Sequence, residues 1–156
     1  MLSVRIVCVG RLKEAYWRGA VAEYEKRLGP LCKFQILELP EARLSQNPTA
    51  GEIAGALDKE AELILPKLAG QALPLCVEGR AVSSEELAGL LDQAMQSPGA
   101  VSFVVGSSYG LAQRVKQTGR GISLSAMTFP HQLARVMLCE QVYRALQILR
   151  GAPYHK

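Results

Sequence analysis

A histidine and an arginine near the start of a C-terminal helix are the first residues of this chain that suggest chemistry. Pro130 lacks an N–H and has a fixed φ, which suits the first turn of a helix, and His131, Gln132 and Arg135 follow within about one turn. Histidine titrates near neutral pH and can take a proton, whereas arginine can hold an anion. The free N–H groups of a helix start can also face a ligand. We therefore expect a ligand site within the stretch from Ile122 to Arg144.

Three segments that expose backbone or carry small residues follow apolar runs and could meet at one edge of a sheet. They are Leu75 to Gly79, Gly106 to Gly110, and Leu124 to Phe129. A crevice between them would suit a flat apolar ring held by main-chain groups. The second segment is neither a dinucleotide fingerprint nor a phosphate loop, so hydride transfer and nucleoside triphosphate hydrolysis lose support. Taken alone, that segment is more often a tight turn that needs glycine.

The thiols and imidazoles of the chain do not form a metal-binding pattern. The four cysteines are scattered along the sequence: Cys8, Cys32, Cys76 and Cys139. No Cys-x-x-Cys pair occurs, and the only histidines are His131 and His155, so we expect no metal site. The apolar runs around Cys8, Cys76 and Cys139 favour buried, inert thiols over nucleophiles, while the setting of Cys32 leaves both roles open.

The distribution of charge favours a polyanion as a partner of the C-terminal part. The formal net charge is +4, but after Asp92 the only acidic residue is Glu140, against seven basic ones. A partner such as nucleic acid and the simple solvation of helix faces explain this excess equally well. No apolar run approaches the ~20 residues of a membrane span. The first ten residues lack the order of a signal peptide, so we expect a cytoplasmic protein.

Hydrophobic patterns and turn residues predict an α/β fold with a mostly parallel sheet flanked by helices. Residues 1–156 suffice for one domain, and no linker divides them. The predicted strands cover 3–9, 33–39, 73–78, 100–105 and 122–124. The predicted helices cover 13–28, 49–67, 83–96 and 130–149, with a short helical piece after Gly110. Strand 100–105 is the most apolar and should be central.

The last helix is apolar over more than one stripe, so it needs cover on several sides. A domain of this size cannot easily wrap a C-terminal helix completely. A second copy of the chain is a reasonable cover, and two-fold homodimers are the commonest assemblies. We therefore favour a homodimer over a monomer.

Five short motifs carry a resemblance to a known family. They are Thr128-Phe-Pro-His-Gln132 followed by Arg135, Glu140-Gln-Val-Tyr-Arg-Ala145, the terminal Pro-Tyr-His-Lys156, Val9-Gly-Arg-Leu-Lys13, and Glu23-Tyr-Glu-Lys-Arg-Leu-Gly-Pro30. Together they resemble the RlmH family over essentially the whole chain. Its members are SPOUT-class methyltransferases that use S-adenosyl-L-methionine to methylate N3 of a pseudouridine in helix 69 of bacterial large-subunit (23S) ribosomal RNA. The resemblance implies rRNA processing in the cytoplasm, on the assembled ribosome.

The same resemblance implies a SPOUT-type α/β fold with a C-terminal trefoil knot, a homodimer, and a set of cofactor contacts. The knot is an exception to the rule that chains do not thread themselves. The implied cofactor-binding residues are Leu75, Gly106, Leu124, Ser125, Ala126, Met127, Thr128 and Phe129. One position departs from the family, because Ser107 stands where a second glycine is usual, and its Cβ could crowd the cofactor.

Methyl transfer from a sulfonium needs alignment and a base, but no metal. The candidate catalytic residues are His131, Arg135, Arg144, Tyr154 and His155. Either histidine could take the proton, the arginines could stabilise an anion or hold phosphate, and Tyr154 could stack on the target ring. Glu140, one turn before Arg144, is expected to be its structural partner.

Two further expectations follow from the size of the subunit and from the remaining functional classes. A small subunit has little surface to spare, so we expect each pocket to be completed by the tail of the other subunit. The competing functions are a non-catalytic ribosome- or RNA-binding factor and a small-molecule nucleotide-binding enzyme. The first would bind RNA without S-adenosyl-L-methionine, and the second would not depend on RNA.

Overall fold

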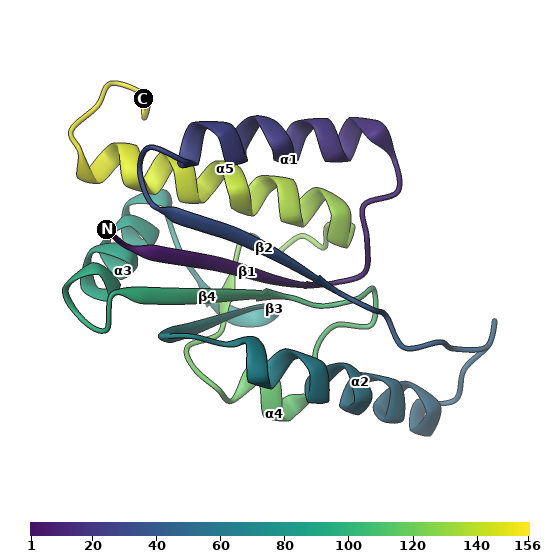
Figure 1. Ribbon diagram of the computed structural model, residues 1–156. Helices are drawn as coiled ribbons and strands as arrows, with labels where there is room; N and C mark the ends of the chain where they lie inside the picture. Colours follow the sequence, from purple (N-terminus) through teal and green to yellow (C-terminus); the bar gives the residue numbers. More distant parts are fainter.

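Five parallel strands form one sheet in the order β2-β1-β4-β3-β5, as Figure 1 shows for the computed structural model, which describes residues 1–156. The strands are β1 (Ser3–Val9), β2 (Lys33–Leu39), β3 (Gln71–Ala81), β4 (Ala100–Val105) and β5 (Ile122–Ser123). The parallel sheet and the central place of β4 confirm the prediction. β5 is shorter than expected and β3 is longer, with an irregularity between Leu75 and Arg80 where its pairing to β5 shifts register.

Five α-helices and one 3-10 turn connect these strands. They are α1 (Ala15–Leu28), α2 (Ala50–Ile64), η1 (Leu65–Lys67), α3 (Ser84–Gln96), α4 (Gln113–Lys116) and α5 (His131–Leu149). The helix starts that the local sequence predicts for α2 and α3 are both confirmed. Thr49 and Ser83 cap α2 and α3, and Glu52 and Glu86 return a hydrogen bond to the cap backbone. Such caps satisfy N–H groups that a helix start leaves unpaired.

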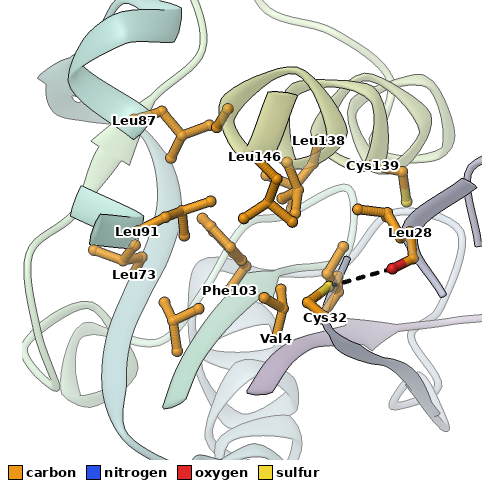
Figure 2. Packing of buried hydrophobic residues seen from close by; sticks show 14 of the residues in the cluster. Val4, Leu28, Cys32, Leu73, Leu87, Leu91, Phe103, Leu138, Cys139 and Leu146 are labelled. Atoms are coloured by element: carbon orange, nitrogen blue, oxygen red, sulfur yellow. Dashed lines mark hydrogen bonds between the residues drawn. The ribbon is translucent and has the colours of Figure 1, made fainter. Parts of the chain in front are cut away.

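The two faces of the sheet bury two separate apolar clusters, because side chains alternate along each strand. Val4, Ile6 and Cys8 of β1 face the layer of α1, α3 and α5, whereas Val7 and Val9 face α2 and α4. Figure 2 shows the larger cluster, in which side chains of α3 and α5 stand over the strands. Helices on both sides explain why β4 is buried along its length after Ala100.

Helix α5 fits into the larger cluster along one side only. Leu138, Cys139, Val142, Ala145 and Leu146 are buried against the sheet, α1 and α3. Other apolar side chains of the helix remain half-buried in the single chain, namely Leu133, Ala134, Val136, Met137 and Ile148; of these, Val136 and Ile148 also touch the cluster, and Ala134 lies at the cavity described below. This second apolar face is consistent with the predicted need for further cover, although its occupant stays a prediction.

None of the helices is long and apolar enough to cross a membrane. The trefoil knot that the sequence resemblance implies stays a prediction. The start of α5 differs slightly from expectation, because Pro130 is the N-cap residue, with φ −55° and ψ 143°, and not the first residue of the helix. The proline still ends an extended segment, so the loop before it and the helix after it meet where predicted.

Candidate active site

A cavity of about 760 Å³ opens at the carboxyl edge of the sheet, next to the start of α5. The three predicted segments all line it: the end of β3 from Leu75 to Glu78, the loop after β4, and the segment after β5. Their convergence is therefore confirmed as geometry. Of the eight residues that the resemblance assigns to the cofactor, seven line the cavity, and Ala126 is the exception.

The first wall of the cavity is the loop from Gly106 to Gly110. A Cβ at Gly106 would lie 2.3 Å from the carbonyl oxygen of Gly110, so only glycine lets the two ends of the loop approach this closely. Gly110 has φ +88°, and its N–H donates to the carbonyl oxygen of Ser107 at 2.9 Å. These contacts give the loop one closed shape at the mouth of the cavity.

Ser107 lies inside this loop, at the position where the sequence departs from the related family. Its side chain is buried, and its Oγ accepts a hydrogen bond from the Tyr109 N–H at 3.4 Å. Behind it lies Glu60 of α2, whose Oε2 accepts from the Ala42 N–H while its buried Oε1 has no partner. Burial raises the pKa of Glu60, and the nearby Ser107 hydroxyl acts in the opposite direction. The serine is thus accommodated within the protein.

The second wall is the segment from Ser123 to Phe129. The Ser123 hydroxyl donates to the carbonyl oxygen of Ser125 at 2.8 Å, and the Met127 N–H donates to Oγ of Ser125 at 3.1 Å. These short-range bonds fold the segment back on itself without a regular element. Met127 remains 72% exposed, so its side chain is available to a bound molecule.

His131 is the one predicted catalytic residue that lines the cavity. Burial lowers the pKa of its imidazole, and Arg135 also lowers it, while Glu41 acts in the opposite direction. Nδ1 is buried without a hydrogen-bond partner. A neutral imidazole with a free nitrogen can accept a proton or a hydrogen bond, so His131 has the chemistry of a base.

Arg135 does not reach the cavity, which differs from the expectation that it faces the transfer chemistry. Its side chain is 1% exposed, and Nη1 lies 2.6 Å from Oε2 of Glu38, on β2. Nη2 donates to the carbonyl oxygen of Gly10 at 3.0 Å. The reason is helical periodicity, because the face of α5 that carries Arg135 is turned toward the sheet and not toward the cavity. Its guanidinium braces the loop after β1.

The other three predicted catalytic residues form a cluster at the far end of α5. Arg144 donates from Nε and Nη2 to Oε1 of Glu140 at 2.9 and 2.6 Å, which confirms the predicted pairing. The Tyr154 hydroxyl donates to the same oxygen at 3.0 Å, and the Arg144 guanidinium lies 4.8 Å from the centre of the Tyr154 ring. Burial and the Glu140 carboxylate raise the pKa of Tyr154 to about 12.

His155 completes this cluster. Its Nδ1 lies 3.2 Å from Nη1 of Arg144, and its Nε2 lies 2.9 Å from Oε1 of Glu85 on α3. Arginine can only donate, so Nδ1 accepts and the hydrogen of the ring is on Nε2, facing Glu85. The C-terminal tail therefore lies ordered on α5 and is not a frayed end.

Within one chain the two groups of predicted residues are separate. His131 and Arg144 are thirteen positions apart on α5, which is about 20 Å along a helix axis. Neither Tyr154 nor His155 lines the cavity. One subunit thus places a cavity with one histidine at one end of α5, and an arginine–tyrosine–histidine cluster at the other.

The structure adds residues that sequence patterns do not connect to the site. Glu38 and Glu85, the partners of Arg135 and His155, lie 97 and 70 positions away from them, and no local pattern signals such pairs. Cys76 and Lys116 also line the cavity, and Lys116 is paired with Glu78. A signal for Cys76 exists in the sequence, because it directly follows Leu75 at the end of a predicted strand.

Three of the four thiols are buried and chemically inert. Burial raises the pKa of Cys8 and Cys139 to about 12, and that of Cys32 to about 11, so these three are poor nucleophiles. Cys76 is half-buried, which differs from the prediction of a buried thiol, although burial still raises its pKa. No three histidine, cysteine or carboxylate side chains are grouped in a way that could hold a metal ion.

Comparisons with known proteins place this geometry in context. Residues 2–155 match a family model described as "Predicted SPOUT methyltransferase". A similar solved structure is a probable methyltransferase from Bordetella pertussis Tohama I, with 20% identity and a TM-score of 0.58, covering 93% of this chain and 95% of that one. Another is Archaeoglobus fulgidus Nep1 bound to S-adenosylhomocysteine, with 13% identity and a TM-score of 0.46, covering 97% and 100%. The Bordetella protein supports the fold.

Proposed function

The chain belongs to the SPOUT methyltransferase family, and from this premise we propose that it transfers a methyl group from S-adenosyl-L-methionine to N3 of a pseudouridine in helix 69 of bacterial large-subunit rRNA. The substrate assignment rests on the motifs that resemble the RlmH family. We place the reaction in the cytoplasm, on the assembled ribosome. The observation that supports catalysis most strongly is the cavity formed by three strand ends, since they are the segments to which those motifs assign the cofactor.

The residues around the cavity fit a molecule with a flat ring and a polar tail. The cavity volume of about 760 Å³ lies within the range typical of small-molecule sites, and about half of the residues that line the cavity are hydrophobic. Gly106 lets the two ends of the loop after β4 meet at the cavity wall, because a Cβ there would overlap the Gly110 carbonyl group. Leu75, Gly106 and the segment from Leu124 to Phe129 would hold the methyl donor. When bound, S-adenosyl-L-methionine supplies a methyl group on a positively charged sulfur, which needs no metal for activation.

The chain's own residues would supply alignment and a base for the N3 proton. His131 has a neutral imidazole in the cavity, and Nδ1 is unpartnered. His155 carries a second imidazole, and Arg144 holds its Nδ1 as an acceptor. The Nδ1 of His131 is free to take that proton, whereas both ring nitrogens of His155 are engaged, one by Arg144 and the other by Glu85. The Tyr154 ring, beside Arg144, would stack on the target base, and the arginine would stabilise the anion that N3 forms on losing its proton.

We further propose that the active protein is a homodimer in which the tail cluster of one subunit completes the cavity of the other. The separation of the two groups along α5 supports this arrangement, because no single chain can use both on one base. The half-buried apolar face of α5 supplies a contact surface. A second depression lies beside it, lined by Val136, Met137 and Glu140 among others. A two-fold axis through this face would place the start of α5 in one subunit beside the end of α5 in its partner.

The shared site can be tested with mixed dimers. One chain carries His155→Ala and the other carries Gly106→Ala, and each homodimer is expected to be nearly inactive. Heterodimers should regain activity at one of their two sites. Equal inactivity of heterodimers and homodimers would refute the shared site.

The activity itself is tested by two measurements. Calorimetry with S-adenosyl-L-methionine separates a methyltransferase from a non-catalytic RNA-binding factor, which would not bind it. Mass mapping of rRNA from cells that lack the gene should show loss of one methyl group at the helix 69 pseudouridine, restored by the wild-type chain. An unchanged methylation map would refute the substrate assignment.

A further inference from the structure

The loop from Gly10 to Lys13 connects β1 to α1 at the same edge of the sheet as the cavity (Figure 1). It leaves β1 next to β4, whose own following loop forms the first wall of the cavity. Arg11 and Lys13 are exposed, whereas Leu12 between them is buried. The loop therefore directs two cationic side chains into solvent, while the side chain of Leu12 packs into the apolar core.

Hydrogen bonds from neighbouring side chains and backbone hold most of the polar backbone of this loop, and among these side chains only Arg135 is buried. The Gly10 N–H donates to the carbonyl oxygen of Leu39 at 2.8 Å, and Nη2 of Arg135 donates to the Gly10 carbonyl at 3.0 Å. The Leu12 N–H donates to Oε2 of Glu38 at 3.2 Å. Nη1 of Arg18 donates to the carbonyl oxygens of Leu12 and Lys13. One conformation of the loop is specified from three separate elements.

The central contact of this set is the ion pair of Arg135 with Glu38, in which the arginine side chain is 1% exposed and the glutamate side chain 38%. The Arg135 guanidinium is removed from water, and the same Glu38 oxygen that it contacts also accepts from the Leu12 N–H. Burial of such a pair adds little to stability compared with an apolar contact of the same shape, and its attested use is to specify one arrangement. Here the arrangement that it specifies is that of the loop.

The side chains of Arg11 and Lys13 are unpaired, in contrast to several other cationic side chains of the chain. Neither side chain forms an ion pair or a hydrogen bond within the chain. By comparison, Arg114, Lys116 and Arg144 each form an ion pair with a carboxylate. Much of the C-terminal excess of basic residues is therefore internally paired. Glu14 and Glu41 belong to the same edge, but neither forms an ion pair with the loop.

We propose that the loop from Gly10 to Lys13 is a phosphate-contact segment for the RNA substrate, with Arg11 and Lys13 as the contacts and Arg135 as the residue that positions them. The inference rests on the proposed RNA substrate and extends it to a surface outside the cavity. A backbone that is already fixed loses less entropy when its side chains bind. A nucleic acid strand entering the cavity offers phosphates beside its rim, which two unpaired cations complement.

Salt-dependent RNA binding tests the two contacts. Fluorescein-labelled wild-type protein is titrated with purified ribosomes whose helix 69 pseudouridine is not methylated, over a series of salt concentrations at fixed magnesium. Replacing both Arg11 and Lys13 with alanine should reduce the slope of log K against log salt by about 1 for each of the two cations that is removed. Affinity at low salt should fall at least about tenfold, while binding of S-adenosylhomocysteine and the melting temperature stay unchanged. The matched control replaces Lys26 and Lys33, two exposed and unpaired cations at the end of α1 and the start of β2, and should change neither slope nor affinity.

The positioning role of Arg135 predicts a change in RNA affinity without a change in its salt dependence. The double variant Arg135→Met with Glu38→Leu removes both charges together, which avoids a lone buried charge and keeps the chain folded. With the loop released, both phosphate contacts can still form, but at a higher entropic cost. Affinity should therefore fall several-fold at every salt concentration while the slope stays that of the wild type. A merely structural role would lower the melting temperature and leave RNA affinity unchanged.

The results of these binding measurements test the two phosphate contacts and the proposed RNA substrate separately. A wild-type slope in the Arg11 and Lys13 variant would overturn the contact proposal alone, because the RNA would then be held elsewhere. A similar loss of slope in the control variant would show that any two cations serve, and it would also overturn the proposal. Failure of the wild-type protein to bind RNA would overturn the proposed RNA substrate together with this inference.

Discussion

Replacing Gly106 by alanine tests whether the loop after β4 shapes the donor site. The added Cβ would lie 2.3 Å from the Gly110 carbonyl oxygen and 2.7 Å from its carbonyl carbon. An ordinary contact needs 3.4 Å or more, so the two sides of the loop must separate by about 1 Å. Both obstacles are backbone atoms, which cannot rotate away as a flexible side chain could.

The expected magnitudes follow from this displacement. Overpacking of this kind costs about 1–3 kcal/mol, and each kcal/mol lowers the melting temperature of a domain of this size by about 2–4 °C. A displacement of about 1 Å in a site that aligns reacting groups can cost about 100-fold in rate. We therefore expect a moderate loss of stability together with a loss of roughly two orders of magnitude in kcat/KM.

A matched glycine separates the two effects. A Cβ at Gly119 would lie 2.1 Å from the carbonyl oxygen of Ala72, an equally severe clash, but Gly119 does not line the cavity. Gly119→Ala should lower the melting temperature by a similar amount and leave the affinity for S-adenosylhomocysteine within about threefold, a change of about 0.7 kcal/mol. Thermal denaturation and calorimetry measure both quantities. Equal affinities of the Gly106 and Gly119 variants would refute the role assigned to the loop.

Three further outcomes are expected. At pH 8 a thiol reagent should modify Cys76 first, because the other three thiols are buried and have high pKa values. S-adenosylhomocysteine should slow this reaction, because Cys76 lines the cavity. Modification of a second thiol at the same rate would contradict the prediction. In a titration of tyrosinate absorbance, Tyr154→Phe should remove the component near pH 12. The raised pKa of the Tyr154 hydroxyl also stabilises the folded protein; this contribution should be complete below pH 10 and should be lost as the pH rises through 12. Ser107→Gly should cost about 0.5–1.5 kcal/mol, the usual range for one hydrogen bond, and leave donor affinity within about threefold; a tenfold change by calorimetry would show that the hydroxyl contacts the donor.

Local rules predicted the elements of this fold well, because each depended on residues close in sequence. The capping pairs of Thr49 with Glu52 and of Ser83 with Glu86 act over three positions, so they could be recognised without any tertiary knowledge. The apolar run of β4 required burial on both faces, which only the centre of the sheet provides. The meeting of three strand ends followed from the rule that parallel strands present their carboxyl ends at one edge.

The role of Arg135 could not be predicted in this way. Its helical position near His131 suggested a shared site, but the direction in which a side chain points depends on how the whole helix is rotated against the sheet. Its partner Glu38 lies 97 residues earlier. Similarly, the excess of positive charge after Asp92 suggested a polyanion partner for the C-terminal part, whereas Arg114 is paired with Asp58 and Glu62 of α2. Sequence counts the charges, but only packing shows which of them are neutralised.

The assembly of the cavity from three distant segments has a consequence for the time at which the protein gains its function. β1 pairs with β4, whose first residue lies about a hundred positions later, and the last wall of the cavity follows β5 near the end of the chain. Contacts of such long range form slowly, because the intervening chain loses conformational entropy on closing before strand pairing compensates for that loss. A growing chain would therefore have no site until nearly all of it has left the ribosome on which it was made. We expect a fragment ending before Ile122 to lack donor binding, even if its first strands have paired.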